Sequence, residues 1–331
     1  MKAALTLICC SLALSYTAIA QSQIDQVDST DRNFLNKPLK QNNQNAQQVP
    51  ILYEGELEDI GPQFLLLEKP RRDWFKLFAD LQVYSSDNAS LFENNPEGTD
   101  IIAATAQIAF IPYVGKYKGG DVTARVGYRE QHFFYGALSG SDQTVNGTPA
   151  ENLDFNNRQP FADLAFERGP LSLKLGIHYS ALRNRESSNQ FYSEISPSWS
   201  ASYDLEVSPK AIVTLSYFGS YRSTKSESFG LLPENWNDQI KQGFAATYSR
   251  LLKEKWILQT SLGVTHSEFE SRDRDREDVL RFFNLSFVHV VSDEITVRLY
   301  TSYEARNSSE PTTESYNNWN LGTAVSLNWG F

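Results

Sequence analysis

Cysteine and histidine are scarce in this chain. The two cysteines, Cys9 and Cys10, lie among the first ten residues, and the four histidines are scattered. Beyond residue 20 no disulfide can form, which excludes the class of small secreted proteins that rely on disulfides for stability. The histidines show no clustered ligand spacing, so the sequence predicts no metal site and no cofactor.

Long apolar runs and an excess of positive charge are also missing. After residue 20 no apolar stretch reaches the roughly 18 residues that a transmembrane helix needs, so a helical membrane protein is excluded. The chain has 40 acidic and 30 basic residues and a net charge of −10, which argues against nucleic acid as a partner. If the protein lies in a membrane, it must cross it as closed strands, because open sheet edges cannot lie in lipid.

The first 72 residues differ in composition from the rest and predict two segments. A positive start, an apolar stretch and an Ala-Ile-Ala cleavage site predict a secretory signal peptide over residues 1–20. A lipoprotein signal cut at Cys10 is disfavoured, because it leaves too short an apolar core. Residues 21–72 are polar at first, rich in Asn and Gln, and predict a largely disordered periplasmic segment that is either a linker or a plug.

From Trp74 onward, apolar and polar residues alternate with a period of two, which is typical of β-strands with one apolar face. From Leu171 to Tyr179, for example, every odd position is apolar, and the even positions carry Ser, Lys, Gly and His. Runs of about ten residues or more can cross a hydrocarbon core of about 25 Å as tilted strands. The twelve runs span residues 74–84, 101–114, 121–134, 156–167, 171–182, 191–207, 211–222, 238–251, 256–268, 278–291, 295–305 and 316–331.

The connections between these runs alternate in length. Short turns such as residues 168–170 and 208–210 alternate with longer polar connections such as residues 136–155 and 223–237. Short periplasmic turns and long external loops are typical of outer-membrane barrels, whereas a soluble β-sandwich has no reason to sort its loops by side. The sequence therefore predicts an all-β fold, an antiparallel transmembrane β-barrel of about 12 strands over residues 73–331.

Aromatic residues gather at both ends of the predicted strands, as amphipathic rings do at the two interfaces of a bilayer. The last run alternates strictly and ends in Leu327, Trp329 and Phe331. In this feature the chain resembles Gram-negative outer-membrane proteins, whose final strand ends in an aromatic residue that the barrel-assembly machinery reads. The resemblance implies an outer-membrane location, with that machinery, the membrane lipids and lipopolysaccharide as partners.

Polar and charged residues occupy the strand face that would line the interior. Pairing across the turn at Gly169 predicts that Asp163 and Glu167 flank Lys174 diagonally, with Arg125 close by on the neighbouring strand. Two interpretations stay open: a charged constriction that selects small polar or anionic solutes, or a salt-bridge network that fills a narrow barrel. The candidate constriction residues are Asp80, Arg125, Arg129, Asp163, Glu167, Lys174, His178, Arg298 and Glu304.

These features favour a passive, porin-like channel for small polar solutes over an enzyme. The alternative is a non-conducting barrel that acts as an envelope scaffold, a surface receptor or an accessory to an export system. Lipid hydrolysis is disfavoured, because it needs a Ser and a His within hydrogen-bonding reach on one face. His266 and Ser267 are adjacent and so point oppositely, and His178 and Ser180 are too far apart along a strand for a direct bond.

Overall fold

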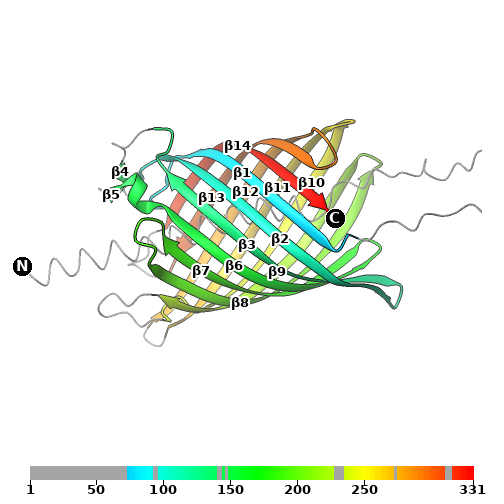
Figure 1. Ribbon diagram of the computed structural model, residues 1–331, viewed down its shortest axis with the longest axis horizontal. Helices are drawn as coiled ribbons and strands as arrows, with labels where there is room; N and C mark the ends of the chain where they lie inside the picture. The colour runs from blue at the N-terminus through cyan, green and yellow to red at the C-terminus, as the bar shows by residue number, and fades with distance from the viewer. Residues whose placement is uncertain are drawn as a thin grey trace, which may run out of the picture.

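The computed structural model describes residues 73–91, 96–139, 144–145, 148–226, 235–271, 274–309 and 315–331. The predicted signal peptide and periplasmic segment, residues 1–72, lie outside these ranges. The described part of the chain forms one closed antiparallel barrel of twelve strands and a separate two-stranded hairpin (Figure 1). The predicted fold class is confirmed.

The strands form because successive side chains point to opposite faces of a sheet, so that one face can meet lipid while the other lines the interior. Strand β1 pairs with both β2 and β14, and this second pairing closes the barrel from Lys76 opposite Gly330 to Ser86 opposite Asn320. The barrel strands are β1 (Phe75–Ser86), β2 (Thr99–Tyr117), β3 (Gly120–Tyr135), β6 (Phe155–Arg168), β7 (Leu171–Asn184), β8 (Gln190–Ser208), β9 (Ala211–Ser226), β10 (Gln239–Lys253), β11 (Trp256–Ser271), β12 (Arg274–Val290), β13 (Ile295–Ser308) and β14 (Tyr316–Gly330).

Each of the twelve predicted runs coincides with one barrel strand, and most strands continue beyond the apolar alternation. Strand β9, for example, was expected to end at residue 222 and extends to Ser226. The connection at residues 136–155, predicted as a loop, contains strands β4 (Thr144–Val145) and β5 (Thr148–Pro149) and the short helix η2 (Ala150–Leu153). These elements are too short to produce a periodic pattern in the sequence.

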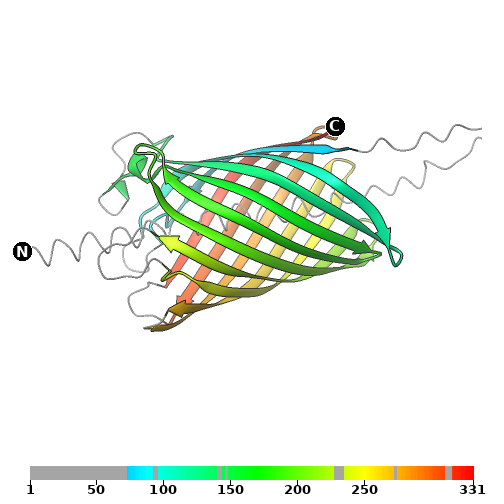
Figure 2. The same cartoon turned by 60° about the horizontal axis from the view of Figure 1, so that its bottom comes forward.

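The two ends of the barrel differ, as the alternation of loop lengths predicts (Figure 2). At the turn end, which holds the start of β1 and the end of β14, tight turns join the strands. Lys118 and Gly119 both have positive φ angles, 46° and 77°, between the paired residues Tyr117 and Gly120. This is the two-residue hairpin turn that matches the twist of the strands, and it favours glycine. The opposite end, called the loop end, carries the longer connections, except that only two residues separate β11 from β12 because these strands extend into the expected loop.

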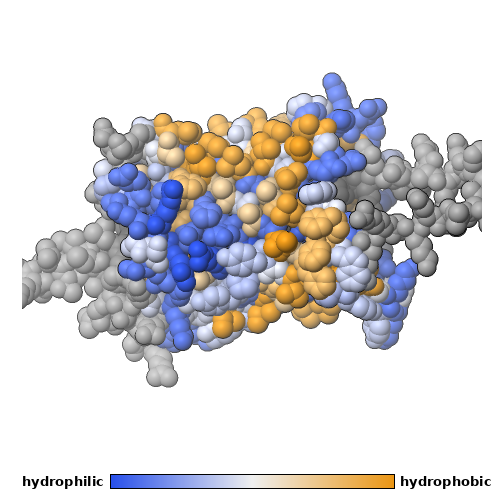
Figure 3. Space-filling model, in the orientation of Figure 1, coloured by the Kyte–Doolittle hydropathy of each residue, from blue (hydrophilic) through white to orange (hydrophobic). Residues whose placement is uncertain are grey.

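The outer surface of the barrel is apolar in a broad band, with hydrophilic surface at both ends (Figure 3). Leucine and phenylalanine side chains in the middle of the band are well exposed, including Leu175, Phe244 and Leu262. Exposed aromatic residues lie near both edges of the band, such as Trp256 and Trp329 towards the turn end. Within the described ranges, no helix has the length and apolar character needed to cross a bilayer.

An apolar core lies inside the loop end, where the long connections pack against inward-facing side chains. The rings of Phe133 and Phe155 stack at 4.6 Å, and Leu153 of η2 is buried in the same cluster. Next to it, Asp154 accepts a hydrogen bond from the backbone N–H of Tyr135 at 2.9 Å, and burial raises the pKa of its carboxyl group. The connection between β3 and β6 is therefore anchored to the barrel wall.

Candidate functional site in the barrel interior

The strand alternation fixes the direction of the candidate side chains. Asp80 is buried on β1, whereas its neighbour Leu81 is 49% exposed on the outer surface. The same alternation on β3, β6, β7 and β13 turns the other eight candidates towards the interior. Their participation in a constriction stays a prediction, but their contacts can be described.

A first cluster crosses strands β3, β6 and β7. Arg125 makes a bidentate ion pair with Asp163, with Nε–Oδ1 at 2.8 Å and Nη2–Oδ2 at 3.0 Å. Lys174 lies diagonally from Asp163, with Nζ 3.7 Å from Oδ2. The register pairs Ala165 with Lys174, as expected from the short turn at Gly169, and this register accounts for the diagonal contact.

A second cluster joins strands β1, β14 and β13. The Nη2 of Arg298 lies 3.0 Å from both carboxylate oxygens of Asp80, and Ser326 on the intervening strand donates its hydroxyl to the same carboxylate. Both charged side chains are almost fully buried, with 1% and 0% of their surface exposed. Two residues further along the same strands towards the loop end, Tyr300 donates a hydrogen bond to Gln82 at 3.0 Å. This wall of the interior is closely packed.

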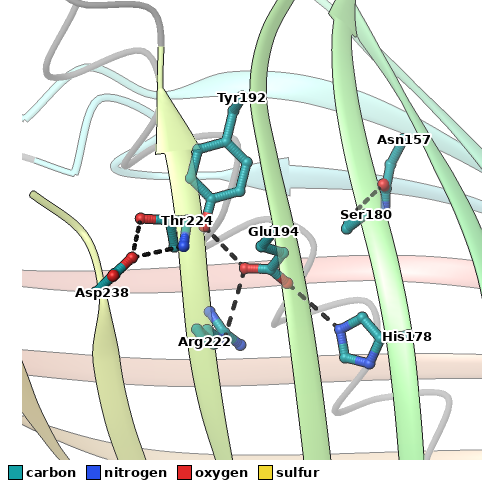
Figure 4. A network of polar contacts seen from close by, with 8 residues as sticks. All are labelled: Asn157, His178, Ser180, Tyr192, Glu194, Arg222, Thr224 and Asp238. Carbon is teal, nitrogen blue, oxygen red and sulfur yellow. Dashed lines mark hydrogen bonds and ion pairs between the residues drawn. The ribbon is translucent and has the colours of Figure 1, made fainter. Parts of the chain in front are cut away.

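A third cluster surrounds Glu194 on β8, nearer the loop end (Figure 4). Tyr192 donates its hydroxyl to Glu194 Oε2 at 2.8 Å, and His178 Nε2 lies 3.4 Å from Oε1. Arg222 on β9 approaches Oε2 at 4.0 Å. The carboxylate of Glu194 is thus held between a cation and an imidazole from the two neighbouring strands. The pattern of inward positions identifies Glu194 and Arg222 as interior residues, but it did not single them out as site residues.

The remaining candidates lie outside these three clusters. Arg129 donates through Nε to Gln107 at 2.9 Å on the β2–β3 wall. Glu167 is exposed at the turn end, opposite Ser172, and Glu304 is buried on β13 towards the loop end. The nine candidates therefore do not form a single ring.

In the ion pairs of Arg125, Lys174 and His178, the basic side chain is more exposed than its carboxylate partner. Lys174 and Arg125 have 40% and 29% of their side-chain surface exposed, whereas Asp163 between them has 6%. His178 is 25% exposed and its partner Glu194 is 8% exposed. Around Asp163 the β3–β6–β7 wall thus presents two cations to the interior and holds the carboxylate behind them, whereas Glu167 is exposed nearer the turn end.

The histidine and serine on this wall have separate partners. His178 contacts Glu194, as described above, whereas Ser180 donates its hydroxyl to Asn157 at 2.5 Å. In the part of the chain that the structure describes, no three His, Cys, Asp or Glu side chains group as metal ligands. The arrangement can hold and orient a charged or polar solute by electrostatics and hydrogen bonds.

The predicted assembly signal lies at the seam between β1 and β14. Trp329 and Phe331 are exposed on the outer surface, where their rings lie 5.4 Å apart, and Phe331 also stacks on Phe75 at 5.6 Å. The backbone N–H groups of Trp74 and Phe75 both donate to the carbonyl of Phe331 at 2.9 Å. Leu327 pairs with Ala79 across the same seam. Recognition by the assembly machinery stays a prediction.

The closed twelve-stranded barrel, with its apolar outer band and polar interior, has the architecture of outer-membrane β-barrel proteins. No protein-family model matches the chain, and no curated protein matches its sequence. Among solved structures, an outer membrane channel from Pseudomonas putida F1 is similar with a TM-score of 0.51 and 10% identity, over 81% of this chain and 100% of that chain. At this identity the likeness shows the fold alone.

Other similar structures also belong to outer-membrane barrels. The NanC porin has a TM-score of 0.41 and 10% identity, over 75% of this chain and 98% of that chain. The β domain of the Bordetella autotransporter BrkA has a TM-score of 0.42 and 11% identity, over 77% of this chain and 99% of that chain. The chain is an outer-membrane-type β-barrel, and its activity must be argued from its own interior.

Proposed function

We propose that the protein is a passive channel of the outer membrane for small polar solutes, with a preference for anions. The observation that carries this proposal is that Lys174 and Arg125 are more exposed than the carboxylate of Asp163, with which both pair. A solute passing the β3–β6–β7 wall meets Lys174 and Arg125 first, while Asp163 is covered. In a bore with low-dielectric walls, exposed charge attracts ions of opposite sign and sets ion selectivity.

Conductance of the refolded protein in planar bilayers tests this function. We expect stepwise single-channel currents and, in a potassium chloride gradient, a reversal potential that indicates chloride preference. Lys174→Glu should shift the reversal potential towards potassium, because it places an exposed negative charge beside the buried Asp163. Lys225→Glu is the matched control: Lys225 is exposed on the outer side of β9, so the same charge change should leave the selectivity unaltered.

One result would contradict the channel, and another would contradict its proposed selectivity. A barrel that is folded but carries no current does not conduct solutes. A conducting barrel in which Lys174→Glu and Lys225→Glu have the same reversal potential as the unmodified protein does not use the β3–β6–β7 wall for selectivity.

A non-conducting barrel is the second candidate, and a separate observation favours it. On the β1–β13–β14 wall, Gln82, Arg298 and Asn318 each have only 1% of their surface exposed. Side chains that line a wide, water-filled bore would have a larger exposed fraction. Comparing the full mature chain with a chain that lacks residues 21–72 distinguishes the two candidates: currents that appear only in the shorter chain identify residues 21–72 as a plug.

A further inference from the structure

A polar patch interrupts the apolar outer band at the loop end of strands β3, β6 and β7. The register places His132, Asn156 and Arg183 side by side across these strands, and Glu130 lies opposite Arg158 in the next row. All five occupy outward-facing positions, in phase with the exposed apolar residues of the same strands. Figure 3 shows hydrophilic surface reaching from the loop end into the apolar band on the face where Figure 1 places these strands.

The patch carries more positive than negative charge. Glu130 compensates Arg158, whose Nε lies 3.4 Å from Oε1. Beyond the patch, Arg185 pairs with Asp154 at 3.3 Å and covers the ring of Phe134 at 4.5 Å. Arg183 has no ion pair with any carboxylate of the described residues, so its positive charge is left over.

Two polar atoms of the patch also lack partners. Arg183 Nε and Asn156 Oδ1 are buried atoms without a hydrogen bond in the described part of the chain, although these residues lie directly opposite each other. Burying a polar atom without a partner costs free energy, and the cost is larger beside a membrane than in water. The unpartnered Nε adds to the cost of leaving the Arg183 charge uncompensated, and an anion bound to its guanidinium would lower this cost.

The height of the patch identifies what kind of anion can reach it. Tyr128 and Tyr179, both exposed, lie on the turn side of the patch, and such interfacial rings mark the level of lipid headgroups. Further towards the turn end, Leu164, Leu175 and Ile177 are exposed on the same three-strand surface. A ligand bound here would have its charged group at the arginines and its apolar part along these side chains.

We propose that this patch binds the phosphorylated headgroup of lipid A, the membrane anchor of lipopolysaccharide, with its acyl chains lying on the outer face of β6 and β7. The inference rests on the outer-membrane location given above and not on conduction. Arginine binds phosphate through two parallel N–H···O hydrogen bonds, and Arg158 and Arg183 come from neighbouring strands at the level of the headgroups.

Binding of lipid A to the refolded full mature chain in zwitterionic detergent tests the proposal, with native mass spectrometry as the readout. We expect lipid A to bind and its dephosphorylated form to bind at least about tenfold more weakly. The double variant Arg158→Gln, Arg183→Gln should lose at least about tenfold in affinity for lipid A. Arg281→Gln is the matched control, because Arg281 is exposed on the outer face of β12, away from the patch, and its loss should change nothing.

Three outcomes would overturn the proposal. They are equal binding of dephosphorylated lipid A, unchanged affinity of the double variant, or an equal loss in Arg281→Gln. Competition with inorganic phosphate separates the two sources of the anion: displacement of lipid A at equal concentration would show a free-phosphate site instead of a lipid site. Heat-modifiable migration confirms that each variant is folded. Conductance of the same variants is read separately, so failure of this proposal and failure of the channel are distinguishable.

Discussion

At the scale of residues, several interior charges form ion pairs that bridge strands. The pair of Asp80 and Arg298 is the most deeply buried of them, and it spans an intervening strand that contributes Ser326. A buried ion pair adds little stability compared with an apolar pair, because desolvation offsets the attraction between the charges. Loss of one partner is costly, since the other charge is then left uncompensated in a low-dielectric environment.

The single variants Asp80→Asn and Arg298→Gln should each lower the free energy of unfolding by about 3–5 kcal/mol. The double variant should be less destabilised than the sum of the two, because it removes both charges. Reversible urea unfolding in lipid vesicles, followed by tryptophan fluorescence, measures all three. Additive losses would show that the two side chains do not interact.

The sequence predicted some of these contacts and not others, for a reason of connectivity. Lys174 and Asp163 lie on strands joined by a short turn, which fixes the register and therefore the diagonal contact. Asp80 and Arg298 are 218 positions apart and lie on strands that come together only when the barrel closes. The alternation shows that both face inward, but no local pattern states which strands become neighbours.

At the scale of elements, several glycines lie beneath aromatic rings of the adjacent strand. A Cβ on Gly263 would lie 2.4 Å from Phe282 Cζ and 2.6 Å from the backbone oxygen of Phe244. Gly243 is covered in the same way by Phe218. An aromatic ring placed over a strand glycine shields the exposed backbone and lets the strand bend, as a closed sheet requires.

Gly263→Ala should therefore lower the free energy of unfolding by about 1–3 kcal/mol, because the new methyl group overlaps a ring and a backbone atom. Gly176→Ala is the control. Its Cβ would meet only Ser198 Oγ at 3.1 Å and nothing else closer than 3.6 Å. We expect that variant to keep its stability or gain up to about 1 kcal/mol from a stiffer unfolded chain. Equal effects of the two variants in urea unfolding would refute the role of the ring.

Strands were easier to predict than the elements between them. Over residues 191–207, apolar and polar residues alternate eight times or more, and this region forms strand β8. The hairpin of β4 and β5 has two residues in each strand, which is too few for any period. The loop-end extension of β9 to Ser226 follows from pairing with the neighbouring β8, and the alternation does not predict it because its residues are polar on both faces.

At the scale of the whole molecule, the barrel depends on one seam between its first and last strands. The backbone carbonyl of Phe331 accepts hydrogen bonds from the N–H of Phe75, in β1, and from the N–H of Trp74, just before it. Its ring lies on the outer surface beside Phe75. No other pair of barrel strands is so far apart in the chain. The seam is therefore the strand pairing with the largest separation along the chain. It also contains Phe331, the residue that the assembly machinery is expected to read.

Deletion of Phe331 should reduce the amount of folded barrel in the outer membrane several-fold. It removes two hydrogen-bond acceptor contacts at the seam and the predicted recognition residue together. Heat-modifiable migration of membrane fractions measures the folded amount. Phe331→Tyr retains the ring and the carbonyl, so it should assemble normally; equal assembly of the deletion and Phe331→Tyr would contradict a role for this residue.

The pairing of Lys76 with Gly330 also has a consequence for synthesis of the protein. Strand β1 leaves the ribosome long before β14 exists, so the edge of β1 that β2 does not cover has no partner until all the other barrel strands have been made. A chain that stops early, or that loses β14 to a protease, keeps two open strand edges, and such edges recruit other chains. Closure thus tests for the last strand, because only a chain that carries β14 can cover both edges.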